Sequence, residues 1–252
     1  PVLFADQNAR VSVGRGVLRV DSTLDYTILQ GKAKEFAIAL PGDATLLSVK
    51  AEGMRTWDMA TQGKDRMLKI QLAEGVADRY QIELQIEQAI GKGSLTEAAA
   101  FSVPTIAAQG VGRETGAVGI LVWKGLKVEP VKTEGVTQVD VREMPAAFQT
   151  LKEQVHLAYR YLQRPFSIEA RVSEVEAKVA AEVMTNVRVS PEALRFTSRI
   201  EYTIRDAGIF RFRIKLGKDV KLVDLQGENI NTWERDAEAM TVDLRTKAEG
   251  QY

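Results

Sequence analysis

Apolar and polar side chains alternate along the segment from Val17 to Gln30. One face of this segment is formed by Leu18, Val20, Ser22, Leu24, Tyr26 and Ile28. The opposite face is formed by Arg19, Asp21, Thr23, Asp25 and Thr27. A period of two predicts an extended strand with one buried and one solvated face, and long strands of this kind are typical of antiparallel sheets.

The same pattern returns 176 positions later in the chain. Residues 17–28 match residues 193–204, and Thr56–Trp57 match Thr232–Trp233. Roughly one position in three is identical between residues 10–57 and their counterparts. Recurrence at a fixed spacing predicts a duplicated structural unit. We expect the two tryptophans, which recur at the same place, to pack at the end of each copy.

Further alternating segments occur in the first copy, at residues 35–40, 46–51, 66–72 and 80–87. About six short strands separated by turn signals are typical of a β-sandwich. We therefore predict an all-β fold of tandem antiparallel β-sandwich domains, with a mixed, mostly β middle segment that carries one short helix. The predicted domains are a first copy over residues 1–90, a middle segment over 91–171 and a second copy over 172–252.

The middle segment is less regular than the two copies. Residues 89–94 are rich in glycine and are expected to form a linker or a wide loop. Residues 145–157 predict the helix, because Phe148, Leu151 and Val155 recur at spacings of three and four.

The second copy is expected to lack its last strand. Tyr252 aligns with Tyr80, the residue that opens the strand at 80–87 of the first copy. Two explanations are open: the sequence is a piece of a longer protein whose next residues supply the strand, or another molecule supplies it. The second follows from the tendency of an unpaired sheet edge to take up an added strand.

Composition narrows the classes of function. The chain has 34 basic and 34 acidic side chains, so no global field attracts nucleic acid. It has no cysteine, which excludes disulfides and thiolate metal sites. No apolar run is long enough to span a bilayer. An apolar start at residues 1–5 without an initiator Met favours a mature chain and an extracytoplasmic (periplasmic or secreted) location.

Candidate catalytic groups are sparse. His156 is the single histidine, which excludes histidine-based zinc sites, and we interpret it as a surface residue on the predicted helix. Four carboxylates in the middle segment are the remaining option, and a hydrolase would need two of them facing each other across a substrate. These are Glu129, Glu134, Asp140 and Glu143. Local ion pairs are the commoner explanation, and we predict no metal and no cofactor.

Four aromatic residues of the middle segment are weak candidates for ligand binding. Aromatic rings suit sugars because the apolar ring face stacks on them, although aromatics on strands more often fill a core. The candidates are Trp123, Tyr159, Tyr161 and Phe166.

The sequence favours a non-catalytic structural or protein-interaction module of a larger, exported bacterial-type repeat protein. A carbohydrate-binding module that uses the aromatic residues is the alternative, and a carboxylate-based hydrolase is the third option. The expected partners are another protein or further domains of the same polypeptide, with self-association through an open sheet edge as a further option.

Overall fold

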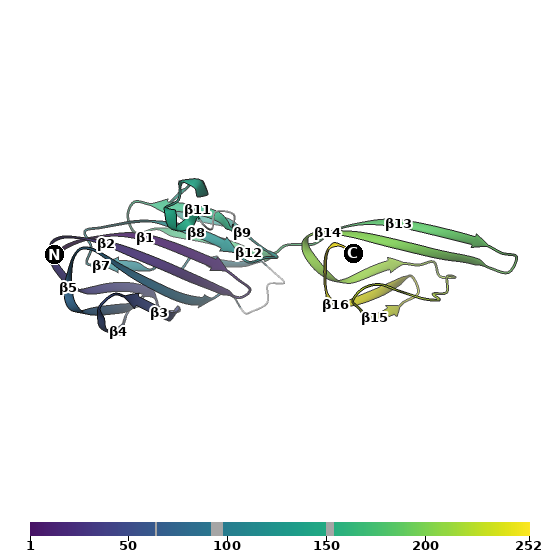
Figure 1. Ribbon diagram of the computed structural model, residues 1–252, viewed down its shortest axis with the longest axis horizontal. Helices are drawn as coiled ribbons and strands as arrows, with labels where there is room; N and C mark the ends of the chain where they lie inside the picture. Colours follow the sequence, from purple (N-terminus) through teal and green to yellow (C-terminus); the bar gives the residue numbers. More distant parts are fainter. Residues whose placement is uncertain (64, 92–97, 150–153) are drawn as a thin grey trace. The chain divides into compact units, whose positions relative to one another are not determined.

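The computed structural model describes residues 1–252 except residues 64, 92–97 and 150–153. The chain forms two compact units, residues 1–174 and residues 175–252 (Figure 1). Strands make up 72% of the chain and helices 3%, which confirms the predicted all-β class. No helix within the described residues is long and apolar enough to cross a membrane.

The larger sheet of the first unit has nine strands. Its main path runs in the order β10, β11, β8, β1, β2, β5, β3, while β4 pairs with β5 and β7 pairs with β2. The strands are β1 (Val2–Val13), β2 (Val17–Pro41), β3 (Thr45–Ala51), β4 (Met54–Gln62), β5 (Asp65–Ala89), β7 (Ala107–Gln109), β8 (Arg113–Val122), β10 (Thr137–Gln138) and β11 (Val155–Tyr161). Neighbours are antiparallel except β1 and β8, which are parallel. The predicted boundary at residue 90 therefore falls inside this unit.

A smaller sheet forms the second layer of the first unit. Its order is β6 (Ala99–Ser102), β12 (Ser167–Glu174) and β9 (Leu126–Glu134). The predicted inward face of residues 18–28 is buried and shares one core cluster with Phe101, Ile168, Ala170 and Val172 from this second layer. Because both sheets turn an apolar face to this cluster, burial of apolar area holds the layers together.

Two long strands of the first unit are bent. The sequence predicted separate strands at residues 17–30 and 35–40, whereas β2 continues through both (Figure 1). At the bend Gln30 and Gly31 have φ angles of 67° and 88°, and the pairing register with β5 shifts between Ile28 and Ala33. A glycine at positive φ and a local register shift let a strand bend without ending.

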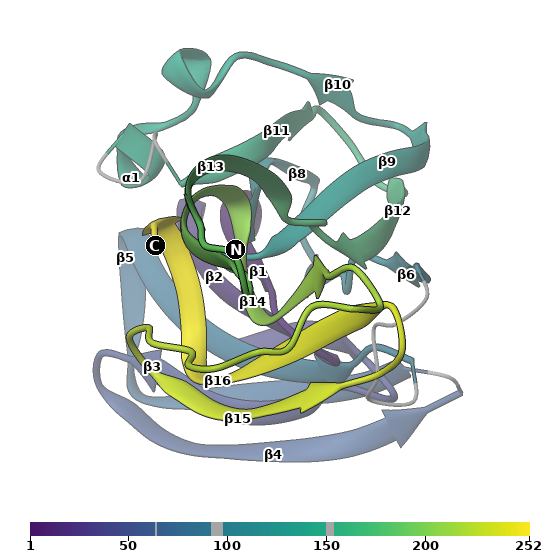
Figure 2. The ribbon, with the colours of Figure 1, turned by 90° about the vertical axis from the view of Figure 1, so that its right-hand side faces the viewer.

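The second unit is one four-stranded sheet in the order β13, β14, β16, β15, seen end-on in Figure 2. The strands are β13 (Lys178–Val189), β14 (Leu194–Lys215), β15 (Ile230–Arg235) and β16 (Ala239–Gln251). In the β13–β14 hairpin Val187 pairs with Phe196, and in the β1–β2 hairpin Val11 pairs with Val20. The two hairpins thus keep the register that the 176-residue spacing predicts. The core of this unit is small and consists of Ile204, Phe212, Met240, Val242, Leu244 and Ala248.

The predicted helix is shorter than the pattern suggested. A 3-10 turn, η1 (Val141–Glu143), is followed by α1 (Ala146–Gln149), and β11 already begins at Val155. Leu151 of the predicted helix lies outside the described residues. From Val155 on, β-branched and aromatic side chains alternate with polar ones, and this pattern fits a pleated strand better than a helix.

Candidate functional site

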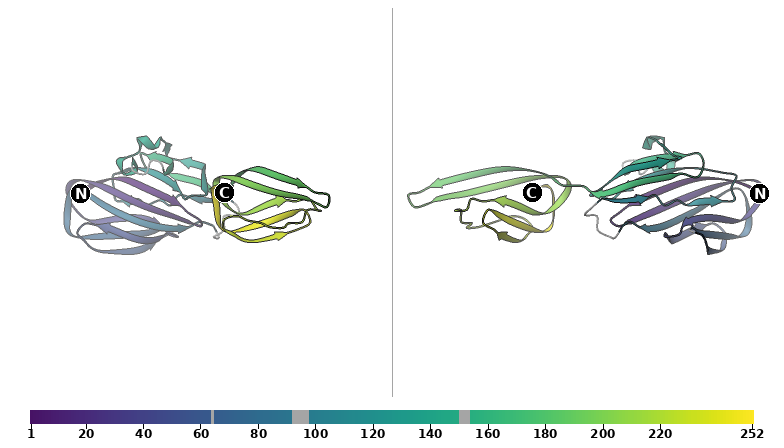
Figure 3. Two further views of the ribbon diagram at one scale, coloured as in Figure 1. Left: turned by 45° about the vertical axis from the view of Figure 1, so that its right-hand side comes forward. Right: turned by 180° about the vertical axis from the view of Figure 1, so that it is seen from behind.

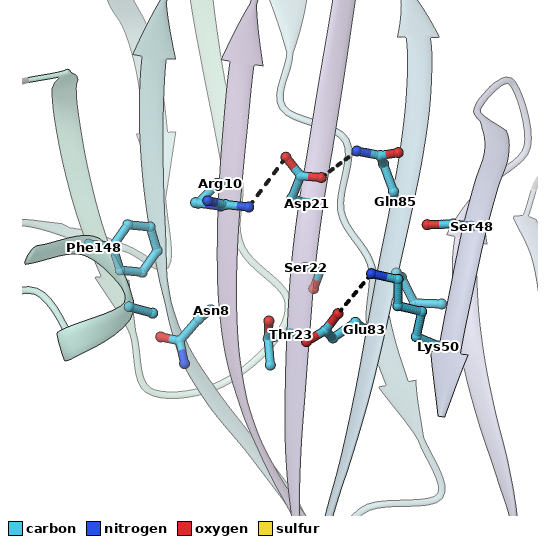
Figure 4. Close-up of a pocket in the computed structure, with 12 residues that line it drawn as sticks. Asn8, Arg10, Asp21, Ser22, Thr23, Ser48, Lys50, Glu83, Gln85 and Phe148 are labelled. Atoms are coloured by element: carbon cyan, nitrogen blue, oxygen red, sulfur yellow. Dashed lines mark hydrogen bonds and ion pairs between the residues drawn. The ribbon is translucent and has the colours of Figure 1, made fainter. Parts of the chain in front are cut away.

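The polar face of the larger sheet carries two rows of facing side chains that cross β1, β2, β5 and β3. Cross-strand register sets Arg10 beside Asp21, and Asp21 beside Gln85. The first row ends at Ser48. The second row lies two residues further along each strand and consists of Asn8, Thr23, Glu83 and Lys50. Directly opposite residues lie about 5 Å apart at Cβ, so polar groups from four strands converge (Figure 4).

A groove with a volume of about 310 Å³ runs over these two rows. Ala147 and Phe148 of α1 also line it (Figure 4). Phe148 is fully buried in a small cluster with Met144 and Ala158. Gly119 makes room for it, since a Cβ there would lie 2.7 Å from the Phe148 ring. The short helix thus presents the exposed Ala147 to the groove, with Phe148 buried behind it.

Charges of both signs face the groove and are only loosely paired. The Arg10 guanidinium lies 3.7 Å from Asp21, and the Lys50 ammonium lies 3.7 Å from Glu83. Gln85 donates a 2.6 Å hydrogen bond to Asp21. Exposed ion pairs at such distances contribute little stability, about 0–1 kcal/mol. Arg10, Lys50 and Glu83 can therefore exchange their partner for a ligand at small cost, whereas Asp21 is also held by Gln85.

Asn8 adds an acceptor that has no partner. Its Oδ1 atom is buried and makes no hydrogen bond within the described residues. Leaving a buried acceptor unpaired costs about 1–3 kcal/mol, and because this atom is closed to solvent, a ligand in the groove does not reach it.

A second polar site lies on the inner side of the same sheet, and its polar groups form hydrogen bonds with one another. The Tyr161 hydroxyl donates to Glu114 at 2.7 Å, and the Arg164 guanidinium donates to the same carboxylate at 2.6 Å. Gln7 connects to both donors. Burial, with the charge of Glu114, raises the pKa of Tyr161 well above its usual range. A Cβ on Gly116 would lie 2.3 Å from the Gln7 carbonyl, so only glycine allows this close packing.

This buried network borders a cavity of about 570 Å³, which Arg113, Leu162 and Gln163 also line. Both carboxylate oxygens of Glu114 and the Nε and Nη2 atoms of Arg164 are used within the network. A fully satisfied buried network rigidifies a fold, and we assign it that role.

The four aromatic candidates do not form an exposed pair. Tyr159, Tyr161 and Phe166 are buried, and the rings of Tyr161 and Phe166 pack 4.4 Å apart. Trp123 is 53% exposed, and its ring packs over Gly14. Stacking on a sugar needs an accessible ring face, so these residues play no part in the proposal below.

The carboxylates of the middle segment lie at the surface. Three of the four pair with a basic neighbour close in sequence, as Lys127–Glu129, Lys132–Glu134 and Arg142–Asp140. Hydrogen bonds from Arg142 lower the pKa of Asp140 to about 2. Glu143 ends η1. His156 is exposed on β11 rather than on the predicted helix, because the strand starts one residue before it.

The tryptophans that recur in the two copies are more exposed than predicted. Trp57 is 46% exposed and Trp233 is 47% exposed, each on a strand at the side of its sheet. Both pair across strands with a buried aliphatic residue. Each ring lies on the same face as its paired residue, but β4 and β15 each pair with one strand within the described residues, so the other side of the ring stays open to solvent.

No group of three or more His, Cys, Asp or Glu side chains in the described part of the chain is arranged to hold a metal ion. The donor set is poor for zinc in any case, with one histidine and no cysteine. We therefore derive no step that depends on a metal.

Comparisons with known proteins give no family. No protein-family model matches the sequence, and no curated protein matches it. Among solved structures, native yeast LTA4 hydrolase matches with a TM-score of 0.41, 11% identity and coverage of 77% of this chain and 31% of that chain. An M1 zinc metallopeptidase mutant from Deinococcus radiodurans, bound to the substrate Tyr-Ser-Ala, matches with a TM-score of 0.37, 10% identity and coverage of 79% and 47%. The chain thus spans less than half the length of either protein.

These matches correct the predicted function. The sequence favoured a non-catalytic module of an exported repeat protein, whereas the solved structures that resemble the chain are enzymes. The pattern of apolar and polar positions reports which faces of a strand are buried, and sheets of this kind occur in enzymes as well as in structural modules. The likeness itself carries no activity over to this chain, because the identities are low and the TM-scores are below 0.5.

Proposed function

We propose that the first unit binds a short zwitterionic peptide in the polar groove of its larger sheet. The observation that carries this proposal is the loose pairing of Arg10 with Asp21 and of Lys50 with Glu83, each at 3.7 Å, on the face that lines the groove. A ligand with one ammonium and one carboxylate matches a surface that offers both charges and has no net charge of its own.

The two rows of side chains set the length of the ligand. Arg10 and Asn8 are two residues apart on β1, which corresponds to about 7 Å along a strand. An extended chain of two residues also spans about 7 Å. Arg10 in the first row then binds the peptide carboxylate, for which the guanidinium fork is suited. Glu83 in the second row accepts from its ammonium group.

The exposed Ala147 gives the groove an apolar contact, which favours a peptide with an apolar side chain. Ala147 and Phe148 line the groove beside Asn8 and Arg10 (Figure 4). Phe148 is buried in its own cluster and anchors the short helix, so the wall at Ala147 is formed before a ligand arrives. A preformed wall lowers the entropic cost of binding.

Binding calorimetry on the full chain tests this function. A dipeptide with free termini should bind, whereas the same dipeptide with an acetylated amine or an amidated carboxylate should bind at least about tenfold more weakly, since each loses a charge-assisted contact. Arg10→Met and Glu83→Gln should weaken binding similarly.

Arg19 and Glu87 supply the matched controls. They form an ion pair of 2.9 Å on the same face of the same sheet but do not line the groove. Arg19→Met and Glu87→Gln should leave peptide binding unchanged. Equal binding of the free and the blocked dipeptides would refute the proposal.

We also infer that the second unit is a copy of the bent sheet of the first. Supporting this, in the first unit the Phe36 ring packs against a tilted Tyr26 ring at a centroid distance of 4.7 Å and stacks on Tyr80 at 5.0 Å. Tyr202, Phe212 and Tyr252 stack in the second with 4.1 and 5.1 Å. A phylogenetic or structural comparison in which the two units branch from unrelated ancestors would contradict the copy. The extracytoplasmic location stays a prediction.

A further inference from the structure

The cavity of about 570 Å³ in the first unit is lined by two connections of the larger sheet. One leads from β7 into β8, and the other follows β11. Because β11 runs antiparallel to β8, the pairing of Tyr161 with Gly116 brings the end of β11 to the start of β8. Figure 3 shows these strands, in teal, beside the purple β1. A cavity of this volume is large enough for a small organic ligand.

Arg164 reaches the cavity with its guanidinium already fixed. Its Nε atom donates to Glu114 at 2.6 Å, and its Nη2 atom donates to Gln7 at 3.1 Å and to the Ile106 carbonyl. The guanidinium also lies over the Phe166 ring, 4.8 Å from the ring centroid. A side chain that is held before a ligand arrives loses little further entropy on binding.

One amino group of Arg164 is left for a ligand. Within the described residues its Nη1 atom makes no hydrogen bond, and this atom is not closed to solvent. The opening beside it is the cavity that Arg164 lines. Because Nη1 carries two N–H donors, it can hold an acceptor of a ligand without breaking any bond of the network.

The cavity carries a net positive charge. Arg113 also lines it and forms no ion pair within the described part of the chain. Glu114, the acidic residue of the lining, balances Arg164 and is 4% exposed. Both of its carboxylate oxygens already accept hydrogen bonds, one from Tyr161 and Arg164 and the other from the Ala108 N–H. The described residues of the lining thus offer a ligand donors and positive charge, and no free carboxylate.

Apolar surface adjoins the two arginines. Leu162 is 70% exposed, and Val111 lines the cavity from the other connection. A ligand with an apolar body would cover these side chains and remove their apolar area from water, which favours binding. An inorganic anion has no such body.

We propose that this cavity binds a small organic carboxylate. The carboxylate accepts from Nη1 of Arg164 and from the guanidinium of Arg113, because the planar fork of arginine matches a carboxylate. The apolar body of the ligand lies against Leu162 and Val111. One net positive charge makes a monoanion the matched ligand, and this separates the cavity from the polar groove, which offers both charges.

Benzoate is the probe for this site, and benzamide is its matched control because it has nearly the same shape without the charge. In a nuclear magnetic resonance titration of the full chain, benzoate should shift the amide signals of residues 109–114 and 162–164. Benzamide should bind at least about tenfold more weakly, since it loses the charge-assisted hydrogen bonds.

Arg113→Met tests the site from the side of the protein. Arg113 takes no part in the buried network, so the variant keeps the network and should bind benzoate at least about tenfold more weakly. Arg160 supplies the matched control, because it is an exposed arginine of β11 that does not line the cavity. Arg160→Met should leave benzoate binding unchanged, and so should Arg10→Met, which alters the polar groove instead.

Several outcomes would overturn the proposal. Equal binding of benzoate and benzamide would show that the site does not recognise charge. Unchanged binding by Arg113→Met, or signal shifts at Asn8 and Ala147 in place of residues 109–114, would place the anion elsewhere. Inorganic phosphate bound as tightly as benzoate would show that the apolar surface at Leu162 plays no part.

Discussion

The β1–β2 and β13–β14 hairpins share their register and much of their sequence, yet one is buried and the other is exposed. Val20 is 1% exposed, whereas Phe196 at the equivalent position is 49% exposed. Leu18 is 1% exposed and its counterpart Leu194 is 59% exposed. An alternating pattern therefore predicts which face of a strand is apolar. Whether that face is buried depends on the strands that pack on it.

Equivalent residues of the two units have similar exposed fractions where their strands have equivalent neighbours. Ile28 is 4% and Ile204 is 3% exposed, while Phe36 is 3% and Phe212 is 5% exposed. In both units this part of the long strand pairs with the next long strand, β5 in the first and β16 in the second. The difference between the hairpins is thus confined to the part that β5, β6, β9 and β12 cover in the first unit.

The largest effect is expected from a charge placed at equivalent positions of the two hairpins. Val20→Asp buries a carboxylate without a partner and should lower the free energy of unfolding of the first unit by at least about 4 kcal/mol. Phe196→Asp leaves its carboxylate in solvent and should cost less than about 1 kcal/mol. Urea denaturation followed by hydrogen exchange in each unit measures both. Similar losses in the two variants would show that the second hairpin is covered in solution.

A smaller effect should separate a buried ion pair of the first unit from an exposed one of the second. Glu114 is buried and binds Arg164, whose side chain is 20% exposed. Glu114→Gln leaves the Arg164 charge uncompensated and should cost about 3 kcal/mol. Asp243 pairs with Arg211 at the surface, so Asp243→Asn should cost about 0.5 kcal/mol or less. Chemical denaturation of the two variants gives the comparison, and equal costs would argue against a structural role for the buried network.

Alkaline pH should also act more strongly on the first unit. Burial raises the pKa of Tyr26 and of Tyr161, and the charge of Glu114 adds to the shift in both. An unfolded tyrosine has its ordinary pKa of 10.0, whereas these two stay neutral in the folded unit well above that pH. The stability that they contribute is therefore present below about pH 10 and declines as the pH rises above it.

Stability measured as a function of pH, together with tyrosinate absorbance, tests this expectation. Tyr161→Phe has no ionisable hydroxyl and should make the decline above pH 10 shallower. The tyrosines of the second unit, Tyr202 and Tyr252, also have raised pKa values, chiefly through burial. Glu228 adds to the shift of Tyr252, but Glu228 is exposed, whereas Glu114 is buried in the core of the first unit. A steeper alkaline loss in the second unit would contradict the assignment.

Local patterns were sufficient to predict the strands but not their non-local partners. The alternation along residues 17–28 correctly placed the buried face of β2 and the polar face that carries Asp21 and Thr23. The parallel pairing of β8 with β1 joins segments about a hundred residues apart, and nothing in either segment specifies it. Pairing between distant strands follows from the packing of the whole core, so it leaves no local signal.

The groove was missed for the same reason. Asn8, Thr23, Glu83 and Lys50 come from four strands, and only the cross-strand register brings them into one row. The buried network left a weak signal, because Gln7 occupies an inward position between the buried residues Ala5 and Ala9. A polar side chain at an inward position indicates a buried hydrogen-bond partner, although the pattern does not name that partner.

The smallest expected effect is that the same substitution at two equivalent arginines changes stability in opposite directions. Arg19→Met removes an exposed ion pair with Glu87 and should destabilise the first unit by about 0.5 kcal/mol. Arg195→Met removes a like charge opposite Arg188 and should stabilise the second hairpin by a few tenths of a kcal/mol. Hydrogen exchange of amides in β2 and β14 resolves the two shifts, and raised salt should shrink both because exposed charges are screened. Destabilisation by both substitutions would mean that Arg195 already has an acidic partner.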